Sequence, residues 1–211
     1  MKKLLFLALS MHIALPTMAY DEVKNWNFEN NEEGRCVVEL NIPTEKDAKT
    51  VLQTIQRNLS KSFVSNNSGS TVTVTGSYSS ASFKELIEEN DSTVTYKLFK
   101  NTKNMFNPFA GNFSENLQCF VTATVKDNNV NIIFEDFTIV FRYLGYGAKE
   151  EIKSFEDRIN QYNENIEKIN NPSTKKKDRK KLIDEQEDIN DELNRSQEEL
   201  NKIIDMIKRG L

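Results

Sequence analysis

The chain has few groups suited to acid–base chemistry at neutral pH, because its single histidine, His12, lies in an apolar stretch near the start. That stretch, residues 4–15, follows two lysines and precedes a small-residue end at Ala19, which is typical of an export signal. We therefore expect residues 1–19 to be removed and the protein to be exported, to the periplasm or beyond the cell. The remaining chain would hold no histidine, which excludes histidine triads and histidine metal sites.

Carboxylates are the acid–base groups that remain in number. They gather in two segments, Glu85, Glu88, Glu89 and Asp91 in the first and Glu135 and Asp136 in the second. A glycoside hydrolase needs two carboxylates about 5–10 Å apart that face one substrate, with the pKa of one raised by burial. Adjacent residues on a strand point to opposite faces, so Glu135 and Asp136 do not form such a pair by themselves. We expect these acids to be solvated, and a carboxylate-based glycan hydrolase stays as an alternative.

Two cysteines, Cys36 and Cys119, fall in phase with the apolar residues of alternating segments. Two inward-facing thiols in an exported protein favour a disulfide between two strands. The alternative is a pair of separate buried thiols that pack as small apolar groups. Neither cysteine has a base nearby in the sequence, so neither is predicted to be catalytic. No glycine-rich phosphate loop and no calcium-loop spacing occurs, so no cofactor and no metal are predicted.

The composition changes near Gly147, and we predict two units, an α+β domain over residues 20–147 and a helical hairpin over residues 148–211. In the first unit, residues 36–42 alternate as a strand and a helix begins at Thr44. About five strands follow. The order of these elements predicts an α+β fold with a mostly antiparallel sheet and one N-terminal helix.

The first unit is predicted to contain an irregular strand and a long loop. The inward-facing residues change from even to odd numbers at Glu135-Asp136, which predicts a bulge or kink. Residues 100–116 are predicted to be a long loop that holds Phe106, Phe109 and Phe113. Such an apolar loop either covers the edge of the sheet or recognises a partner, and these phenylalanines are our candidate contacts.

The second unit is predicted to be two helices, over about residues 149–170 and 174–209. The first has apolar residues at alternating steps of three and four, the spacing of a coiled-coil seam: Ile152, Phe155, Ile159, Tyr162, Ile166 and Ile169. The short connection at Pro172 makes the helices antiparallel neighbours. The second helix is longer by about a dozen residues. Its surplus apolar residues need another surface, for which we expect the sheet rather than a second copy: Leu200, Ile203, Ile204 and Ile207.

A basic run opens the second helix and consists of Lys175, Lys176, Lys177, Arg179, Lys180 and Lys181. Positive charges at the start of a helix oppose its dipole. Either Glu164 and Glu167 of the neighbouring helix offset these charges, or the tip of the hairpin contacts an anionic surface such as phospholipid or a polyanionic glycan.

Residues 35–143 resemble a family of exported bacterial domains of unknown function whose fold is like that of TATA-binding protein. The resemblance is carried by Ile42-Pro43 before the first helix, by the hairpin turn at Lys126–Asn129, and by Asp136-Phe137. The family usually has a glycine in this turn, where the present chain has asparagine. The resemblance implies a fold and supplies no catalytic residues. It does not imply DNA binding.

Charge and hydropathy argue against nucleic-acid binding and against a membrane-spanning segment. Removing the signal changes the net charge from −4 to −6, which argues against nucleic acid. No later stretch approaches the roughly 20 apolar residues that span a bilayer. The sequence therefore predicts an exported, non-enzymatic binding or scaffolding module, whose hairpin associates with a partner protein or with itself. A purely structural envelope protein that dimerises through its hairpin is a further alternative.

Overall fold

The computed structural model describes residues 28–30, 34–65, 82–107, 111–144 and 149–211. The predicted export signal, residues 1–19, lies outside these ranges. The elements are, in chain order, β1 (Glu29–Asn30), β2 (Cys36–Pro43), α1 (Ala48–Leu59), β3 (Val64–Ser65), β4 (Phe83–Glu89), β5 (Thr93–Asn107), β6 (Gly111–Lys126), β7 (Asn129–Leu144), β8 (Lys149–Ser154), α2 (Phe155–Asn170) and α3 (Lys176–Lys208).

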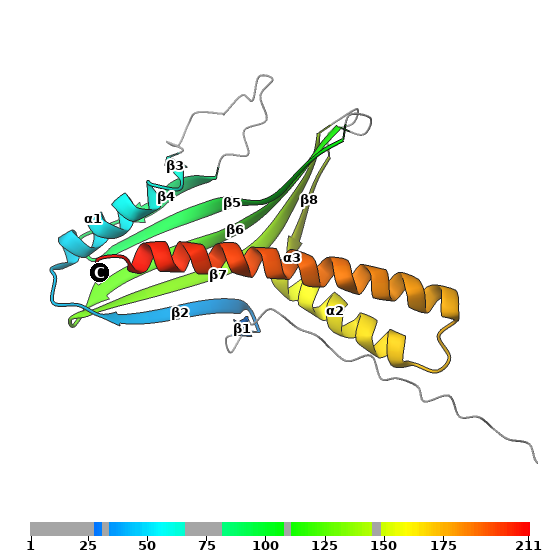
Figure 1. Ribbon diagram of the computed structural model, residues 1–211. Coiled ribbons are helices and arrows are strands. Elements are labelled where there is room, and N and C mark those ends of the chain that lie inside the picture. Colours follow the sequence, from blue (N-terminus) through cyan, green and yellow to red (C-terminus); the bar gives the residue numbers. More distant parts are fainter. Residues whose placement is uncertain (1–27, 31–33, 66–81, 108–110, 145–148) are drawn as a thin grey trace, which may run out of the picture.

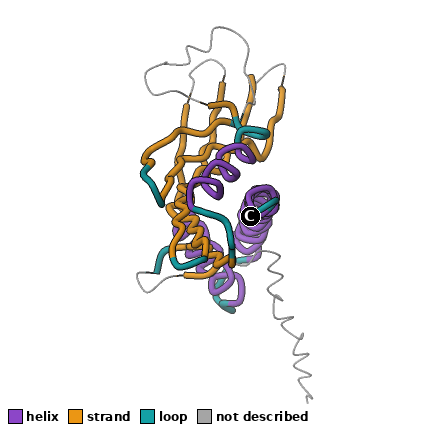
Figure 2. The backbone as a smooth tube through the Cα atoms, turned by 90° about the vertical axis from the view of Figure 1, so that its left-hand side faces the viewer, coloured by secondary structure: helices purple, strands orange, loops and turns teal. Residues whose placement is uncertain are grey.

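The strands form one sheet in the order β1-β2-β7-β6-β5-β4-β3, and β8 also pairs with β7. The β3–β4 pair is parallel and all the others are antiparallel. Helices α1 and α3 lie on one face of this sheet (Figures 1 and 2). The predicted α+β fold with a mostly antiparallel sheet is confirmed.

Helix α1 begins four residues later than predicted. Asp47 caps it, and its Oδ1 accepts a hydrogen bond from the Thr50 backbone N–H at 2.9 Å. The backbone N–H of Thr44 instead donates to the carbonyl of Asn128 in the β6–β7 turn, at 2.9 Å. Thr44 therefore continues the pairing of β2 with β7 and cannot start the helix.

Strand β7 is kinked at the predicted place. Asp136 has a φ of +53°, and the register between β6 and β7 shifts between Gln118 and Phe120. Before the kink β7 pairs with β2, and after it the same edge of β7 pairs with β8. The predicted bulge at Glu135-Asp136 is confirmed, and it lets one long strand serve two partners.

The predicted loop over residues 100–116 is wrong. Strands β5 and β6 run through this region as a long hairpin, with Met105 opposite Phe113 and Lys103 opposite Glu115. The segment is rich in polar residues because it projects beyond most of the core, so the alternation of apolar and polar residues that signals a half-buried strand is weak. Backbone pairing with β7 holds β6 in place along the same stretch.

The predicted first helix of the hairpin is too long at its start. Residues 149–154 form β8, and Ser154 then caps α2 by accepting a hydrogen bond from the Asp157 N–H at 3.1 Å. Ile152 therefore lies outside the seam and is 58% exposed. The buried positions of α2 are Phe155, Arg158, Tyr162, Asn165 and Ile169. The buried face of α2 therefore includes two polar residues, Arg158 and Asn165, that the predicted apolar seam did not contain.

Helix α3 spans 33 residues, or about 50 Å, and packs on α2 with its first half. Its second half crosses the sheet beside α1 (Figure 1). The surplus residues Leu200, Ile203, Ile204 and Ile207 are buried in one core with the sheet and α1, as expected. The division into two units at Gly147 stays a prediction, and α3 packs against both parts. None of the helices described is long and apolar enough to cross a membrane.

Candidate functional site

The outer parts of β5, β6 and β7, together with β8, extend past the helices as a projecting end of the sheet (Figure 1). We call this end the wing and define it as residues 101–107, 111–117, 138–144 and 149–154. Its strands stay paired along their length, from Asn107 opposite Gly111 to Tyr143 opposite Lys149. The wing is therefore continuous sheet whose side chains are held in fixed rows.

One row of the wing is apolar and partly exposed. Met105 lies opposite Phe113, and Phe113 lies opposite Tyr143. The ring centroids of Phe113 and Tyr143 are 5.2 Å apart, and those of Phe113 and Phe141 are 6.2 Å apart. Met105 is 50% exposed and Tyr143 42% exposed. We call Met105, Phe113 and Tyr143 the aromatic strip.

The aromatic strip lies on the face of the sheet that carries the core. Side chains alternate along a strand, so Tyr143 shares its face with Phe141 and Ile139, which are buried. Phe113 likewise shares its face with Leu117, which is buried. The strip therefore lies on the same face of the sheet as the core, in a part of that face that the helices do not cover.

The predicted contact residues divide accordingly. Phe113 belongs to the strip, whereas Phe109 and the side chain of Phe106 lie outside the part of the chain that is described. The sequence reasoning missed Tyr143, because it reads as one more inward-facing residue of an alternating strand. Only its position beyond the helices exposes it.

The predicted basic residues all lie at the tip of the hairpin between α2 and α3. The five lysines Lys175, Lys176, Lys177, Lys180 and Lys181 are exposed, and Arg179 is half-buried. Arg179 donates from Nη2 to the carbonyl of Asn171 at 3.2 Å. Glu164, one of the two acids expected to offset these charges, pairs instead with Lys168 at 3.0 Å.

One buried and one half-buried carboxylate lie between α3 and its neighbours, and an arginine binds each. Glu115 of β6 accepts hydrogen bonds from Arg195 at 3.0 and 2.7 Å and from the Thr102 hydroxyl at 2.9 Å. Burial lowers the pKa of Arg195, but the hydrogen bonds and charge of Glu115 outweigh it and raise that pKa. Glu192 of α3 accepts from Arg158 of α2. Burial raises the pKa of Glu192 in spite of this arginine.

These ion pairs connect elements, and each of the two carboxylates is bound to an arginine rather than facing a second carboxylate. Both carboxylate oxygens of Glu115 accept hydrogen bonds from Arg195, and Oε2 of Glu192 accepts a hydrogen bond from Arg158. The acids singled out from the sequence are exposed, apart from the half-buried Glu85. In the described ranges no group of three or more histidine, cysteine or acidic residues could hold a metal ion. The arrangement gives the hydrolase alternative no support.

The predicted disulfide between Cys36 and Cys119 is wrong. The two residues lie on β2 and β6, with β7 between them, and both are buried thiols. Two strand spacings separate their backbones by about 10 Å, beyond the reach of a disulfide. Burial raises the pKa of each thiol to about 12, and in Cys36 Glu156 adds to the effect. The alternative of two separate packing thiols fits the structure.

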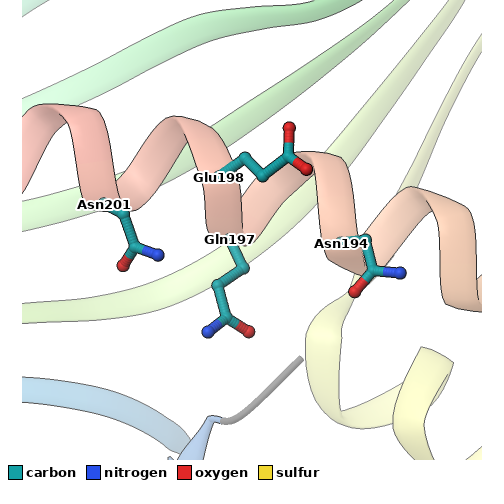
Figure 3. A pocket seen from close by; sticks show the side chains of 4 residues that line it. All are labelled: Asn194, Gln197, Glu198 and Asn201. Atoms are coloured by element: carbon teal, nitrogen blue, oxygen red, sulfur yellow. The ribbon is translucent and has the colours of Figure 1, made fainter. Parts of the chain in front are cut away.

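A polar hollow of about 360 Å³ lies beside α3 and was not expected from the sequence. Its described lining consists of Asn194, Gln197, Glu198 and Asn201 (Figure 3). The three amides recur at steps of three and four, so they follow one side of the helix. That spacing is the signal by which the sequence could have shown them. The amides supply hydrogen bonds, and Glu198 is the single carboxylate in the described lining, so the described residues bring no pair of acid–base groups together in the hollow.

The comparisons with known proteins concern the fold. No family model matches the chain, and no curated protein is similar to it. A TBP-like protein from Parabacteroides distasonis is 15% identical, covering 85% of this chain and 96% of that one, with a TM-score of 0.44. A DUF4468 family protein from Bacteroides ovatus is 10% identical, covering 86% of this chain and 90% of that one, with the same TM-score of 0.44. Neither name indicates a ligand or an activity.

Proposed function

We propose that this protein is an exported, non-enzymatic binding or scaffolding module that contacts another protein through the aromatic strip. The observation that carries the proposal is the half-exposed row of Met105, Phe113 and Tyr143 on the wing. Methionine and aromatic residues are enriched in protein interfaces, and tyrosine is enriched among the few residues that carry most of the binding energy. Because the strip is part of a paired sheet, its backbone is already ordered and loses little conformational entropy on binding.

The residues beside the strip indicate the chemistry of the partner. Lys103 lies on the same face, two residues from Met105, and Lys149 lies opposite Tyr143. Among the described residues, Lys149 has one ion-pair contact, from its Nζ to a carboxylate oxygen of Glu151 at 3.8 Å. A partner that complements this surface presents an apolar side chain flanked by carboxylates.

The α2–α3 hairpin is less suited to an apolar contact with a partner than the sequence suggested. The large apolar side chains that are exposed in the described ranges are Leu86, Ile87, Met105, Tyr143 and Ile152. These residues lie on β4 and on the wing, and α2 and α3 contribute none. The apolar seam of the hairpin is used within the chain, which favours the wing as the contact surface.

The test is a crosslinking pull-down from envelope extract that compares matched variants of the chain from Tyr20 onward. Tyr143→Ser and Met105→Ser remove apolar surface from the strip and, being at exposed positions, should leave the fold intact. Ile152→Ser is the control, because Ile152 is at least as exposed but lies on the opposite face of the wing.

The proposal expects one protein whose recovery falls about tenfold or more in the double strip variant and stays unchanged in the control. Loss in both the strip variants and the control, or no species that depends on the strip, would contradict it. If the captured species is the chain itself, sedimentation of the purified protein must show a dimer that the strip variant lacks, and the partner is then a second copy.

A further inference from the structure

We infer that the tip of the α2–α3 hairpin is an electrostatic contact site for an anionic phospholipid surface, which the protein meets end-on. This site is separate from the aromatic strip and does not depend on it. It consists of the basic residues Lys175, Lys176, Lys177, Arg179, Lys180 and Lys181, which we call the basic tip.

Among the described residues, the charges of the five lysines of the basic tip are not neutralised by ion pairs. In the described part of the chain, none of its five lysines forms an ion pair with a carboxylate. Of the two acids on α2 that were expected to offset these charges, Glu164 pairs with Lys168, and Glu167 forms no ion pair with the basic tip among the described residues. Asp178 is the single acid within the run, so the tip carries a net charge of +5 in a protein that is acidic overall.

The basic tip also opposes the stability of its own helix. The N-cap of α3 is Lys175, without a side-chain hydrogen bond, whereas Asp47 and Ser154 cap α1 and α2. Cations at this end are unfavourable because they face the positive end of the helix dipole. Folding therefore gives no reason for six basic residues here, and an external anion does.

The arrangement of the basic residues suits a plane of negative charge. Successive helical residues are about 100° apart, so the exposed lysines Lys176, Lys177, Lys180 and Lys181 span roughly 140° of the circumference of α3, with Lys175 at its N-terminus. A linear polyanion that continued along this side of the helix would meet the exposed acids Asp184 and Glu185. A flat surface met end-on can approach the lysines without meeting these acids.

The rest of the molecule enforces this orientation. The tip is at the free end of the hairpin, at the opposite end of the molecule from α1 and the β6–β7 turn (Figure 1). Asp184 and Glu185 follow the run on α3 and are exposed, so an anionic surface is repelled from the side of the helix. Because the exposed large apolar residues of the described ranges lie on β4 and the wing, attraction at the tip depends on charge and is sensitive to salt.

The experiment measures binding of the chain from Tyr20 onward to sedimented vesicles. Vesicles of phosphatidylcholine alone are compared with vesicles in which about one-third of the lipid is phosphatidylglycerol. Lys176→Gln, Lys177→Gln and Lys180→Gln are combined in the tip variant. Lys49→Gln, Lys126→Gln and Lys208→Gln form the control, which loses the same charge from exposed positions at the other end of the molecule.

We expect binding to the anionic vesicles alone, lost at high salt. Each lysine that reaches the surface contributes about a fivefold change in partitioning, so the tip variant should bind about a hundredfold more weakly. The control should stay within a few-fold of the unaltered chain. The tip variant should also melt no lower than the unaltered chain, since its helix dipole is relieved.

Three results would overturn the inference. Equal losses in the tip variant and the control would show general attraction rather than a site. Binding that persists at high salt would show apolar insertion instead. Retention on a sulfated glycan column that depends on the tip, without binding to anionic vesicles, would assign the tip to a linear polyanion.

Discussion

Arg195 of α3 and Glu115 of β6 are joined by two parallel hydrogen bonds, from Nε to Oε1 at 3.0 Å and from Nη2 to Oε2 at 2.7 Å. Eighty residues separate them in the chain, and the side chain of Glu115 is 1% exposed. This pair fixes the long helix to the base of the wing. A buried carboxylate without its partner is costly, because it has left water and gained nothing in return.

The first prediction follows from the unequal exposure of these partners. Arg195→Met leaves Glu115 buried and unpaired, and we expect it to lower the free energy of unfolding by about 3–5 kcal/mol. Glu115→Leu should cost less, since the Arg195 side chain is 26% exposed and can reach water. The double variant should be more stable than Arg195→Met alone. Urea unfolding of all four proteins measures this, and equal costs for the two single variants would contradict the argument.

The second prediction concerns the kink in β7. Asp136 adopts a φ of +53°, which β-branched residues resist most and glycine accepts without strain. Asp136→Val should lower the free energy of unfolding by about 1–2 kcal/mol, while Asp136→Gly should change it little. Glu135→Val is the control, because this exposed neighbour does not have a positive φ. Thermal unfolding compares the three, and an equal loss in Asp136→Val and Glu135→Val would show that the backbone is not strained.

The third prediction concerns a polar residue in the seam of the hairpin. Gln186 is 1% exposed, and neither polar atom of its amide has a hydrogen-bond partner among the described residues. Burying such a group costs about 1–3 kcal/mol, so Gln186→Leu, which keeps a similar volume, should raise the free energy of unfolding. Gln186→Ala serves as the control for volume and should destabilise by leaving a cavity. A loss of stability in Gln186→Leu would mean that a water or another group satisfies the amide.

The fourth prediction concerns the thiols. Burial raises the pKa of Cys36 and of Cys119 to about 12, from a value of 9.0. We expect both to resist a thiol reagent at neutral pH in the folded protein and both to react after denaturation. Labelling followed by mass spectrometry measures this. A protein that gains no label after denaturation without reductant would contain the disulfide that the structure excludes.

The same shift predicts how stability depends on pH at alkaline values. The folded state holds the thiol protons more tightly than the unfolded state does. Stability from these groups is therefore complete below pH 9.0 and falls as the pH rises from there to about 12. Cys119→Ala should reduce the slope of stability against pH in this range, apart from its cost in packing.

Several features could be predicted because they depend on residues close together in the chain. The apolar stripe of α1, the turn at Asp127–Asn129 and the kink at Asp136 each follow from local spacing or local backbone preference. The two helices of the hairpin and the burial of Leu200 to Ile207 follow from periodicity and length.

The errors arose where a neighbour outside the local sequence provides hydrogen bonds. Residues 149–154 have helical spacing, yet the open edge of β7 beyond its kink pairs with them as β8. The segment over 100–116 lacks a clear alternation, yet β6 lies between β5 and β7 and becomes a strand by pairing with both. Arg158 is buried on the face of α2 that contacts α3, which the predicted seam did not include, because its guanidinium binds Glu192 of α3.

The sequence by itself determined the class of the fold, the absence of histidine chemistry beyond His12, and the basic charge at the tip of the hairpin. Each depends on residue types and short-range periodicity. The tertiary structure alone decided that Tyr143 is exposed, that Glu115 is paired with Arg195, and that β7 separates Cys36 from Cys119. These outcomes depend on which strands become neighbours and on how much of the sheet the helices cover. No local sequence pattern encodes either of these.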